Sequence, residues 1–288
     1  MLFRSHGLVF RKDPPKSIIE TERGPEFRAL QMFHPADGVP VPEALFLEEG
    51  GDAFGAPAFI MREIAGGEVH SGFDADPFGE AREQIGHDFF SALGKIAAAD
   101  PGPLGLPPVS PADRVRHWQA VVEDDATGPE PVARIAADWL IENAPAPEPE
   151  PAVVHGDYRR GNFLVKGGRI TAILDWEMVH VGDPLEDLAW ACDDLWVSGG
   201  PNVAGTVPET EAIRIWEEAS GRKVDAARYR WWKVFAQYMG LAIWISSEAE
   251  VVSGRSTQIP VIWAAIYPYR WHNHALAVSL RKAMENTA

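Results

Sequence analysis

Three short stretches decide the expected fold: residues 155–162 read HGDYRRGN, residues 175–177 read DWE, and residues 182–189 read GDPLEDLA. Short apolar runs, whose length and bulk favour β-strands, lie beside them at 153–154, 163–165 and 170–174. The polar residues of the first two stretches therefore lie in loops at the ends of predicted strands. Catalytic and binding residues are often found on such loops, because the strands hold them in place.

One predicted hairpin brings two polar side chains together. Gly167-Gly168 predicts a tight turn, so the strand that starts after Asn162 returns and ends at Asp175. An amide oxygen and a carboxylate that meet there form the hard-oxygen site that Mg²⁺ prefers. Asp157, on the preceding loop, is free to accept a proton from an attacking hydroxyl. One carboxylate for the nucleophile and metal ligands for phosphate charge together indicate phosphoryl transfer.

With these motifs the sequence resembles the aminoglycoside phosphotransferase family, a small-molecule branch of the protein-kinase-like fold. The motifs HGDYR…N, LDWE and GDP…DLAW are most similar to those of the kinase-like domains fused to acyl-CoA dehydrogenases. The resemblance runs from about Leu8 to the last helices. It implies that Asp157 is the catalytic base and that Asn162 and Asp175 bind Mg²⁺. It also implies that His155 and Asp183 support the catalytic loop.

Two arginines follow the expected base. Arg159 stands where protein kinases have a lysine that reaches the transferred phosphate, so the resemblance implies that it stabilises charge on the γ-phosphoryl group. Its neighbour Arg160 has two interpretations, a contact with a substrate carboxylate or an ordinary surface ion pair. A surface ion pair is also the alternative for Arg159.

The first lobe carries the expected nucleotide contacts. Strand alternation puts Arg11 and Lys12 on opposite faces, so only one of them enters the cleft, and the family register favours Arg11. Glu26, on the following helix, is its expected ion-pair partner, the alternative being an exposed helix charge. Residues 61–64, which begin with Met61, resemble the hinge, whose backbone binds adenine; the expected contacts are Arg62, Glu63 and Ile64.

These features predict an α+β, protein-kinase-like fold of two lobes. Residues 1–67 form a small, β-rich lobe that binds part of the nucleotide. Residues 68–288 form a larger, mainly helical lobe with the catalytic loop, the metal site and the acceptor site. A helix is expected over 18–32, with Gly24-Pro25 marking its true start.

Composition limits the partners. The net charge of −16 argues against nucleic acid and anionic membranes, which carry the same sign. The single Cys192 excludes an internal disulfide. The longest late apolar run, 239–245, is too short to span a bilayer, and the first residues lack a signal-peptide pattern, so a cytoplasmic setting is expected.

Two departures from the wider pattern shape the functional prediction. Only ten residues precede Arg11 and they contain no glycine-rich loop to cover ATP phosphates, so a catalytically impaired pseudokinase or nucleotide-binding module is the alternative. Only a few residues separate Asp175 from Gly182, which leaves no room for a peptide-docking activation segment. A small-molecule acceptor is therefore expected. A hydrolase is disfavoured, since no serine or cysteine lies in a strained elbow beside a histidine.

The leading prediction is an ATP- and Mg²⁺-dependent kinase that phosphorylates a hydroxyl of a small molecule. The arginine pair and the acyl-CoA dehydrogenase resemblance favour a hydroxy acid or its acyl-CoA ester. The acidic net charge and the wider family favour an aminoglycoside or another cationic alcohol. The sequence leaves both acceptor classes open.

Overall fold

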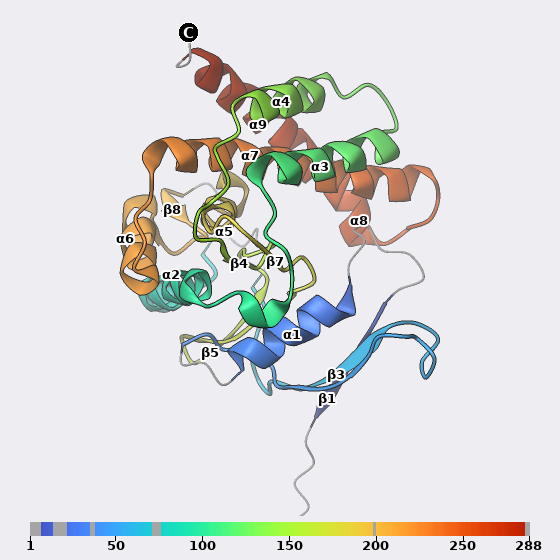
Figure 1. The fold of residues 1–288 in the computed structure, drawn as a ribbon, viewed down its shortest axis with the longest axis vertical. Helices are drawn as coiled ribbons and strands as arrows, with labels where there is room; N and C mark the ends of the chain where they lie inside the picture. The colour runs from blue at the N-terminus through green and yellow to red at the C-terminus, as the bar shows by residue number, and fades with distance from the viewer. Residues whose placement is uncertain (1–6, 14–21, 35–37, 71–75, 198–199, 286–288) are drawn as a thin grey trace, which may run out of the picture. The chain divides into compact units, whose positions relative to one another are not determined.

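The computed structural model describes residues 7–13, 22–34, 38–70, 76–197 and 200–285. The chain divides into two compact units, the first made of Met1–Pro108 with Glu150–Lys223 and the second of Val109–Pro149 with Val224–Ala288 (Figure 1). The lobe boundary expected near residue 67 lies inside the first unit. All three stretches that decide the expected fold belong to the first unit as well.

The first unit opens with a small sheet and one helix. The helix α1 (Arg23–Phe33) starts at the predicted Gly24-Pro25 signal. The strands β1 (Leu8–Lys12), β2 (Ala44–Glu48) and β3 (Ala58–Arg62) form an antiparallel sheet in the order β1-β3-β2. The rings of Phe27 on α1 and Phe59 on β3 meet edge to face, so α1 packs on one side of this sheet.

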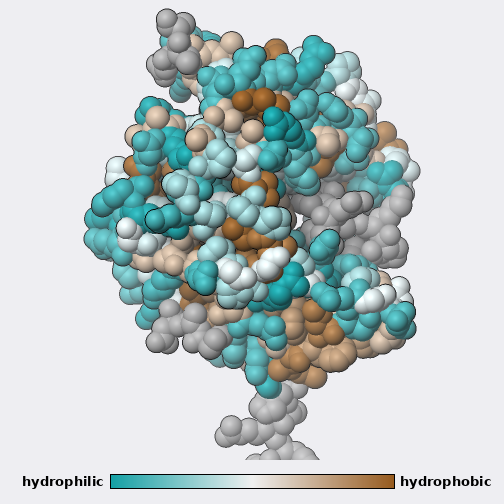
Figure 2. Space-filling view, in the orientation of Figure 1, coloured by the Kyte–Doolittle hydropathy of each residue, from teal (hydrophilic) through white to brown (hydrophobic). Residues whose placement is uncertain are grey.

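Strand alternation separates the two faces of this sheet. Phe10, Ile60 and Phe46 are paired across β1, β3 and β2, and Phe10 and Phe46 are largely exposed. Figure 2 shows hydrophobic side chains gathered over these strands, at the lower edge of the view. The opposite face of β1 carries Arg11, as the sequence predicts, whereas Lys12 Nζ bonds to the Phe54 carbonyl oxygen.

The rest of the first unit carries the polar stretches. Its elements, in chain order, are η1 (Gly79–Ala81), α2 (Arg82–Ala98), η2 (Gly102–Leu104), β4 (Ala152–Val154), β5 (Phe163–Lys166), β6 (Arg169–Ile173), β7 (His180–Gly182), α5 (Leu185–Ala191), η3 (Asp194–Val197), β8 (Asn202–Val203), β9 (Val207–Pro208) and α6 (Glu209–Ser220). The predicted hairpin is β5–β6, with Gly167 and Gly168 both at positive φ in its turn. The helix α2 packs on α6, β4 and β6 through its buried face.

Two connections position the hairpin. The backbone N–H of Ile173, at the end of β6, donates to the Pro40 carbonyl oxygen at 2.7 Å, and Glu68 forms an antiparallel bridge with Val165. The ring of Trp176 packs on Phe33 of α1 with centroids 5.0 Å apart. The residues after β6 are therefore fixed against α1, which carries Glu26.

The second unit is helical in its described residues. It comprises α3 (Pro111–Asp125), α4 (Pro131–Glu142), α7 (Ala226–Val252), α8 (Ile259–Ala264) and α9 (Tyr267–Glu285). The long α7 packs against the other four helices (Figure 1). Most of its side chains are buried, Trp231 and Trp232 among them, whereas Trp263 and Trp271 on α8 and α9 are partly exposed. No helix in the described part of the chain is long and apolar enough to cross a membrane.

Candidate functional site

The loop between β4 and β5 is held by a carboxylate from α5. Asp187 accepts hydrogen bonds from the backbone N–H groups of His155 (2.6 Å) and Gly156 (2.9 Å). Asp183, which the resemblance gave a supporting role, accepts from the backbone N–H of Leu185, the first residue of α5. The carboxylate seen to anchor the loop backbone is thus Asp187, in the same GDPLEDLA stretch.

Two ring side chains complete the anchoring of this loop. The buried imidazole of His155 lies with Nε2 3.0 Å from the Leu174 carbonyl oxygen, and its Nδ1 accepts from the Asp157 backbone N–H at 3.2 Å. Tyr158 donates its hydroxyl to the Phe89 carbonyl oxygen on α2. The expected supporting role of His155 agrees with these contacts, and Tyr158 adds a second attachment.

The carboxylate of Asp157 is surrounded by hydrogen-bond donors. Asn162 Nδ2 donates to Asp157 Oδ2 at 2.7 Å and to its backbone carbonyl oxygen at 2.9 Å. Trp190 Nε1 donates to Oδ1 at 2.8 Å. Arg159 Nε lies 2.9 Å from Oδ1 and 3.1 Å from Oδ2, and its guanidinium stacks over the Trp196 ring. The carboxylate therefore stands in a fixed orientation at the end of the loop.

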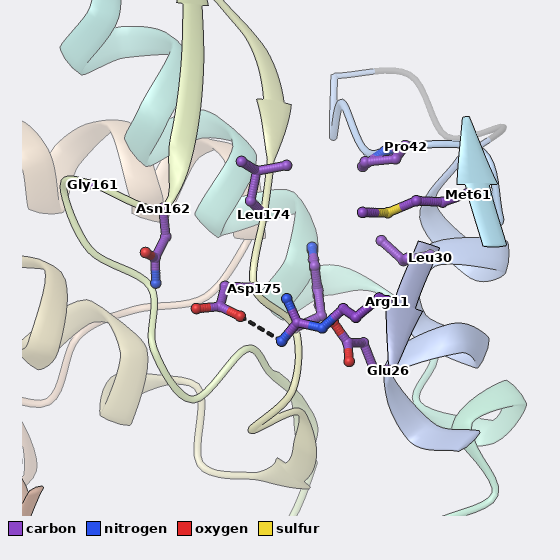
Figure 3. A pocket seen from close by; sticks show the side chains of 10 residues that line it. Arg11, Glu26, Leu30, Pro42, Met61, Gly161, Asn162, Leu174 and Asp175 are labelled. Atoms are coloured by element: carbon purple, nitrogen blue, oxygen red, sulfur yellow. Dashed lines mark hydrogen bonds and ion pairs between the residues drawn. The ribbon is translucent and has the colours of Figure 1, made fainter. Parts of the chain in front are cut away.

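A pocket of about 290 Å³ lies beside this loop. Its lining residues are Arg11, Glu26, Leu30, Pro42, Met61, Gly161, Asn162, Leu174, Asp175 and Trp176. In Figure 3, Asn162, Leu174 and Asp175 face Arg11, Glu26, Leu30 and Met61 across the cavity. The structure thus brings the two predicted metal ligands and the predicted basic residue to one cavity, and Asp157 adjoins it through Asn162.

The donor set of Asn162 and Asp175 fits a hard cation. Asn162 directs its amide N–H groups to Asp157, which leaves its amide oxygen as the remaining acceptor. Asp175 gives one carboxylate oxygen to Arg11, and the other oxygen points toward Asn162 in Figure 3. Asp175 also has a φ of 66°, a backbone conformation that is uncommon for non-glycine residues and recurs at functional sites. Mg²⁺ needs only one or two protein ligands when phosphates and water complete its shell.

Asn162 and Asp175 are the candidate metal centre. Within the residues that the structure describes, no group of three or more His, Cys, Asp or Glu side chains could hold a metal ion. Asn162 is outside that criterion because its ligand atom is an amide oxygen.

Arg11 is the centre of an ion-pair network on the opposite wall. Its Nε lies 3.0 Å from Glu26 Oε1, and its Nη2 lies 2.7 Å from Asp175 Oδ1 and 2.6 Å from Glu177 Oε2. The predicted Arg11–Glu26 pair is therefore present. Glu26 is only 3% exposed, which rules out the exposed helix charge.

A second guanidinium shares Glu26. The buried Arg23 pairs with Glu26 and Asp13 and lies 3.6 Å from Glu177 Oε2. Burial raises the pKa of Glu26 to about 7, although Arg11 and Arg23 both favour its ionised form. Burial also raises the pKa of Glu177, and the neighbouring Asp175 carboxylate adds to that rise. The carboxylates of this wall pair with the guanidinium groups of Arg11 and Arg23. The phosphate groups of a nucleotide would compete with these carboxylates for the guanidinium groups.

Of the predicted hinge stretch, the pocket is lined by Met61 but by none of the three residues that follow. The backbone N–H of Arg62 donates to the Glu43 carbonyl oxygen, and that of Glu63 donates to the Gly7 carbonyl oxygen, so both are committed to the sheet. The Arg62 side chain pairs with Glu43 at 2.6 Å. Ile64 follows the end of β3.

Arg160 lies inside the first unit. Its side chain is completely buried, and a Cβ added at Gly205 would lie 2.4 Å from its Nη1. It therefore points into the interior and not to the surface.

Four functional-site residues escaped the sequence reasoning: Trp190, Asp187, Arg23 and Glu177. Asp187 lies in the quoted stretch 182–189 and Glu177 in the stretch 175–177, so their carboxylates were visible but unassigned. Trp190 is 1% exposed, as a core residue is, yet it also contacts the expected base. Arg23 stands three residues before Glu26, an i, i+3 spacing that would have indicated their ion pair on a helix.

Comparison with known proteins agrees with this geometry. The family model described as "Phosphotransferase enzyme family" (APH) matches residues 4–232. Acyl-CoA dehydrogenase family member 11 of Gallus gallus is 28% identical over 175 residues, covering 58% of this chain and 22% of that protein. Probable acyl-CoA dehydrogenase IBR3 of Arabidopsis thaliana is 25% identical over 279 residues, covering 86% and 34% respectively. The chain thus spans between a fifth and about a third of these relatives.

Solved structures show the same fold. A Ralstonia eutropha protein provisionally assigned as an aminoglycoside phosphotransferase superposes with a TM-score of 0.75 at 21% identity, covering 95% of this chain and 86% of that one. A thermostable mutant of aminoglycoside phosphotransferase APH(4)-Ia, in a ternary complex with AMP-PNP and hygromycin B, gives a TM-score of 0.52 at 20% identity, covering 90% and 82%. The expected α+β, protein-kinase-like fold and the expected family resemblance are confirmed.

Proposed function

Because the chain belongs to the phosphotransferase enzyme family, we propose that it is an ATP-dependent kinase that transfers the γ-phosphoryl group to a hydroxyl of a small molecule. The observation that carries this proposal is the meeting of Asn162 and Asp175 with the Arg11–Glu26 pair around one pocket, next to Asp157. Phosphoryl transfer depends on positioning and on charge stabilisation, and these residues supply both.

In this proposal Asp157 is the base that orients the acceptor hydroxyl and takes its proton. Its carboxylate is held by Asn162 and Trp190, so its acceptor lone pairs keep a fixed direction. Arg159 is the group that stabilises charge on the γ-phosphoryl. It is 27% exposed at the side chain and bonds to Asp157, which is consistent with a guanidinium able to exchange a carboxylate for a phosphoryl oxygen.

Arg11 is the proposed contact to the nucleotide phosphates. Glu26 holds the Arg11 guanidinium in place through its ion pair with Nε. The Arg11 Nη2 pairs with Asp175 and Glu177, and the fork of a guanidinium also suits phosphate oxygens. Asn162 and Asp175 would hold Mg²⁺, which when bound neutralises the phosphate charge that develops during transfer. The AMP-PNP complex of the structural neighbour supports nucleotide as the donor.

The apolar part of the pocket is the proposed adenine side. Leu30, Pro42, Met61 and Leu174 line it. Because the N–H groups of Arg62 and Glu63 already bond within the sheet, backbone recognition of adenine falls to their carbonyl oxygens and to Ile64. We keep residues 1–67 as the part that contributes nucleotide contacts and residues 68–288 as the part that contributes the base, the metal ligands and the acceptor site.

For the acceptor we favour a hydroxy acid or its acyl-CoA ester. The support is the likeness to acyl-CoA dehydrogenase family proteins in two distant organisms, together with a guanidinium beside the base. The competing class is an amino sugar, since hygromycin B is bound by the structural neighbour.

The test measures ATP consumption with a panel of acceptors: hydroxy acids of increasing chain length, their coenzyme A thioesters, hygromycin B and kanamycin. We expect Mg²⁺-dependent turnover with the hydroxyacyl compounds. Turnover only with the amino sugars would contradict the acceptor class. Thermal stabilisation by Mg²⁺-ATP with no turnover on any acceptor would contradict the kinase and favour a nucleotide-binding module.

Variants assign the turnover to this site. Asp157→Ala and Asp175→Ala should each lower kcat by at least a hundredfold while the protein stays folded. Asp52→Ala changes an exposed aspartate in the β2–β3 turn and serves as the matched control, with wild-type turnover expected. Full activity in either site variant would overturn the assignment.

A further inference from the structure

The proposed base receives one rigid donor on each carboxylate oxygen and one shared donor. Trp190 Nε1 lies 2.8 Å from Oδ1, and Asn162 Nδ2 lies 2.7 Å from Oδ2. Arg159 Nε spans both oxygens, at 2.9 and 3.1 Å. The three donors occupy the acceptor sites that an incoming hydroxyl would need, so one of them has to leave for the reaction.

Trp190 cannot be the one that leaves. It is 1% exposed on α5, and its ring packs edge to face on Trp196 with centroids 5.1 Å apart. Asp187, three residues earlier on the same helix, bonds to the backbone of the loop that carries Asp157. The helix α5 therefore holds the backbone of the loop through Asp187 and the carboxylate of its base through Trp190.

Arg159 is the donor that can move. Its side chain is 27% exposed, compared with 14% for Asp157, and its Cζ lies over the Trp196 ring, 5.0 Å from the centroid. A cation is attracted to an aromatic face within about 6 Å of the ring centroid, so the guanidinium can shift over Trp196 and keep this attraction as it leaves the carboxylate. Loss of Arg159 from the carboxylate frees one lone pair on each oxygen.

We propose that Trp190 is a positioning residue for phosphoryl transfer. Its indole N–H keeps the Asp157 carboxylate from rotating, through the hydrogen bond to Oδ1, while the acceptor hydroxyl replaces Arg159 on that carboxylate. This inference rests on the kinase function proposed above. The hydroxyl proton passes to the Asp157 carboxylate as the new bond from the acceptor oxygen to the γ-phosphorus forms. The bond from that phosphorus to the bridging oxygen breaks, and ADP leaves with its electron pair.

Removing the indole N–H should slow the chemical step and leave nucleotide binding alone. In Trp190→Phe the carboxylate keeps Asn162 on one oxygen but can rotate with Arg159, so fewer molecules present the base to the hydroxyl. The loss of one hydrogen bond to a charged group predicts a kcat about 10-fold to 100-fold lower. The KM for ATP should stay within about twofold of wild type, because Trp190 does not line the nucleotide pocket.

Trp216→Phe is the matched control. Trp216 is an equally buried indole of the same unit, on α6, and its Nε1 has no hydrogen-bond partner among the described residues. Both variants lose an indole N–H and some ring volume, so both report the cost of repacking. Equal kcat values for Trp190→Phe and Trp216→Phe would overturn the proposal, and so would a wild-type kcat in Trp190→Phe.

An NMR measurement separates this inference from the kinase proposal. The indole ¹H–¹⁵N signal of Trp190 is identified by its loss in Trp190→Phe, and in Asp157→Asn it should move upfield because the charged acceptor is gone. A signal that stays in place would overturn the Trp190–Asp157 bond whatever the activity. A wild-type protein with no turnover on any acceptor, but with the shifted signal, would instead contradict the kinase function and leave the bond standing.

Discussion

Asp187 Oδ1 accepts a hydrogen bond from the backbone N–H of Gly156 at 2.9 Å, across 31 residues of sequence. Its second oxygen accepts from the backbone N–H of His155, so one buried carboxylate satisfies two donors of the proposed catalytic loop. Burial raises the pKa of Asp187 to about 7, against the two N–H groups that favour its ionised form. A single side chain thus links the fold of α5 to the position of the base.

Asp187→Ala should both destabilise the first unit and stop turnover. Two buried N–H groups lose their acceptor, and each costs about 1–3 kcal/mol of unfolding free energy. Urea unfolding measures this cost. Asp225→Ala, which removes the exposed N-cap of α7, should cost only about 1 kcal/mol and leave turnover intact. Similar small losses in both variants would show that the loop does not depend on Asp187.

Gly156 should not tolerate a side chain. Its φ is 87°, and an added Cβ would lie 2.4 Å from the Met178 carbonyl oxygen, a backbone atom that cannot move away alone. Gly156→Ala should therefore displace the loop and abolish turnover. Gly167→Ala is the control: its φ of 58° is equally left-handed, but nothing lies within 4 Å of the added Cβ.

The control should lose about 1 kcal/mol from backbone strain and keep its kcat. The measurement is thermal unfolding together with ATP turnover for both variants. If both glycine variants behave alike, strain rather than the contact with Met178 explains the loss.

Much of the fold could be predicted from local sequence patterns. The Gly167-Gly168 turn predicted the β5–β6 hairpin, Gly24-Pro25 marked the start of α1, and both depend on backbone preferences of the residues themselves. Alternation along β1 separated Arg11 from Lys12 because successive strand residues face opposite sides. The hairpin geometry then placed Asn162 and Asp175 at one pocket, as expected.

Contacts between distant segments could not be predicted in this way. Trp190 meets Asp157 across 33 residues, and only the packing of α5 on the loop decides that its indole N–H points there. That Asp187 accepts from the loop backbone likewise depends on which face of α5 meets the loop. Arg23 and Glu26 pair locally at i, i+3 on α1, whereas the approach of Arg23 to Glu177 depends on the packing of distant segments.

Arg11→Lys should weaken ATP binding far more than Lys12→Met. Lysine keeps the charge but loses the guanidinium whose Nη2 pairs with Asp175 and Glu177 and whose fork would span phosphate oxygens. The KM for ATP should rise about 10-fold or more, as expected for a charge-assisted bidentate contact. Lys12 bonds to Phe54 on the other face of β1, so its variant should bind ATP normally, and equal effects in the two variants would contradict the assignment of Arg11.

The stability of the protein should depend on the neutral state of His155. Its Nδ1 accepts from the Asp157 N–H, which requires an unprotonated ring nitrogen, and burial lowers its pKa from 6.5 to about 4. Between those values the unfolded chain binds a proton that the folded chain does not, so this group's contribution is complete above about pH 6.5 and declines as the pH falls toward 4. The gap corresponds to about 3 kcal/mol at most.

His155→Gln isolates this contribution. Its free energy of unfolding, measured by urea at several pH values between 4 and 7.5, should fall less steeply on acidification than that of the wild type. Glu26 and Asp187, whose raised pKa values tilt stability the opposite way in this range, are present in both proteins and largely cancel in the comparison. His274→Gln, on the exposed side of α9, should retain the wild-type slope. A wild-type slope in His155→Gln would mean that the imidazole is protonated equally in the folded and unfolded chains, and the tautomer inferred from the Asp157 N–H would be wrong.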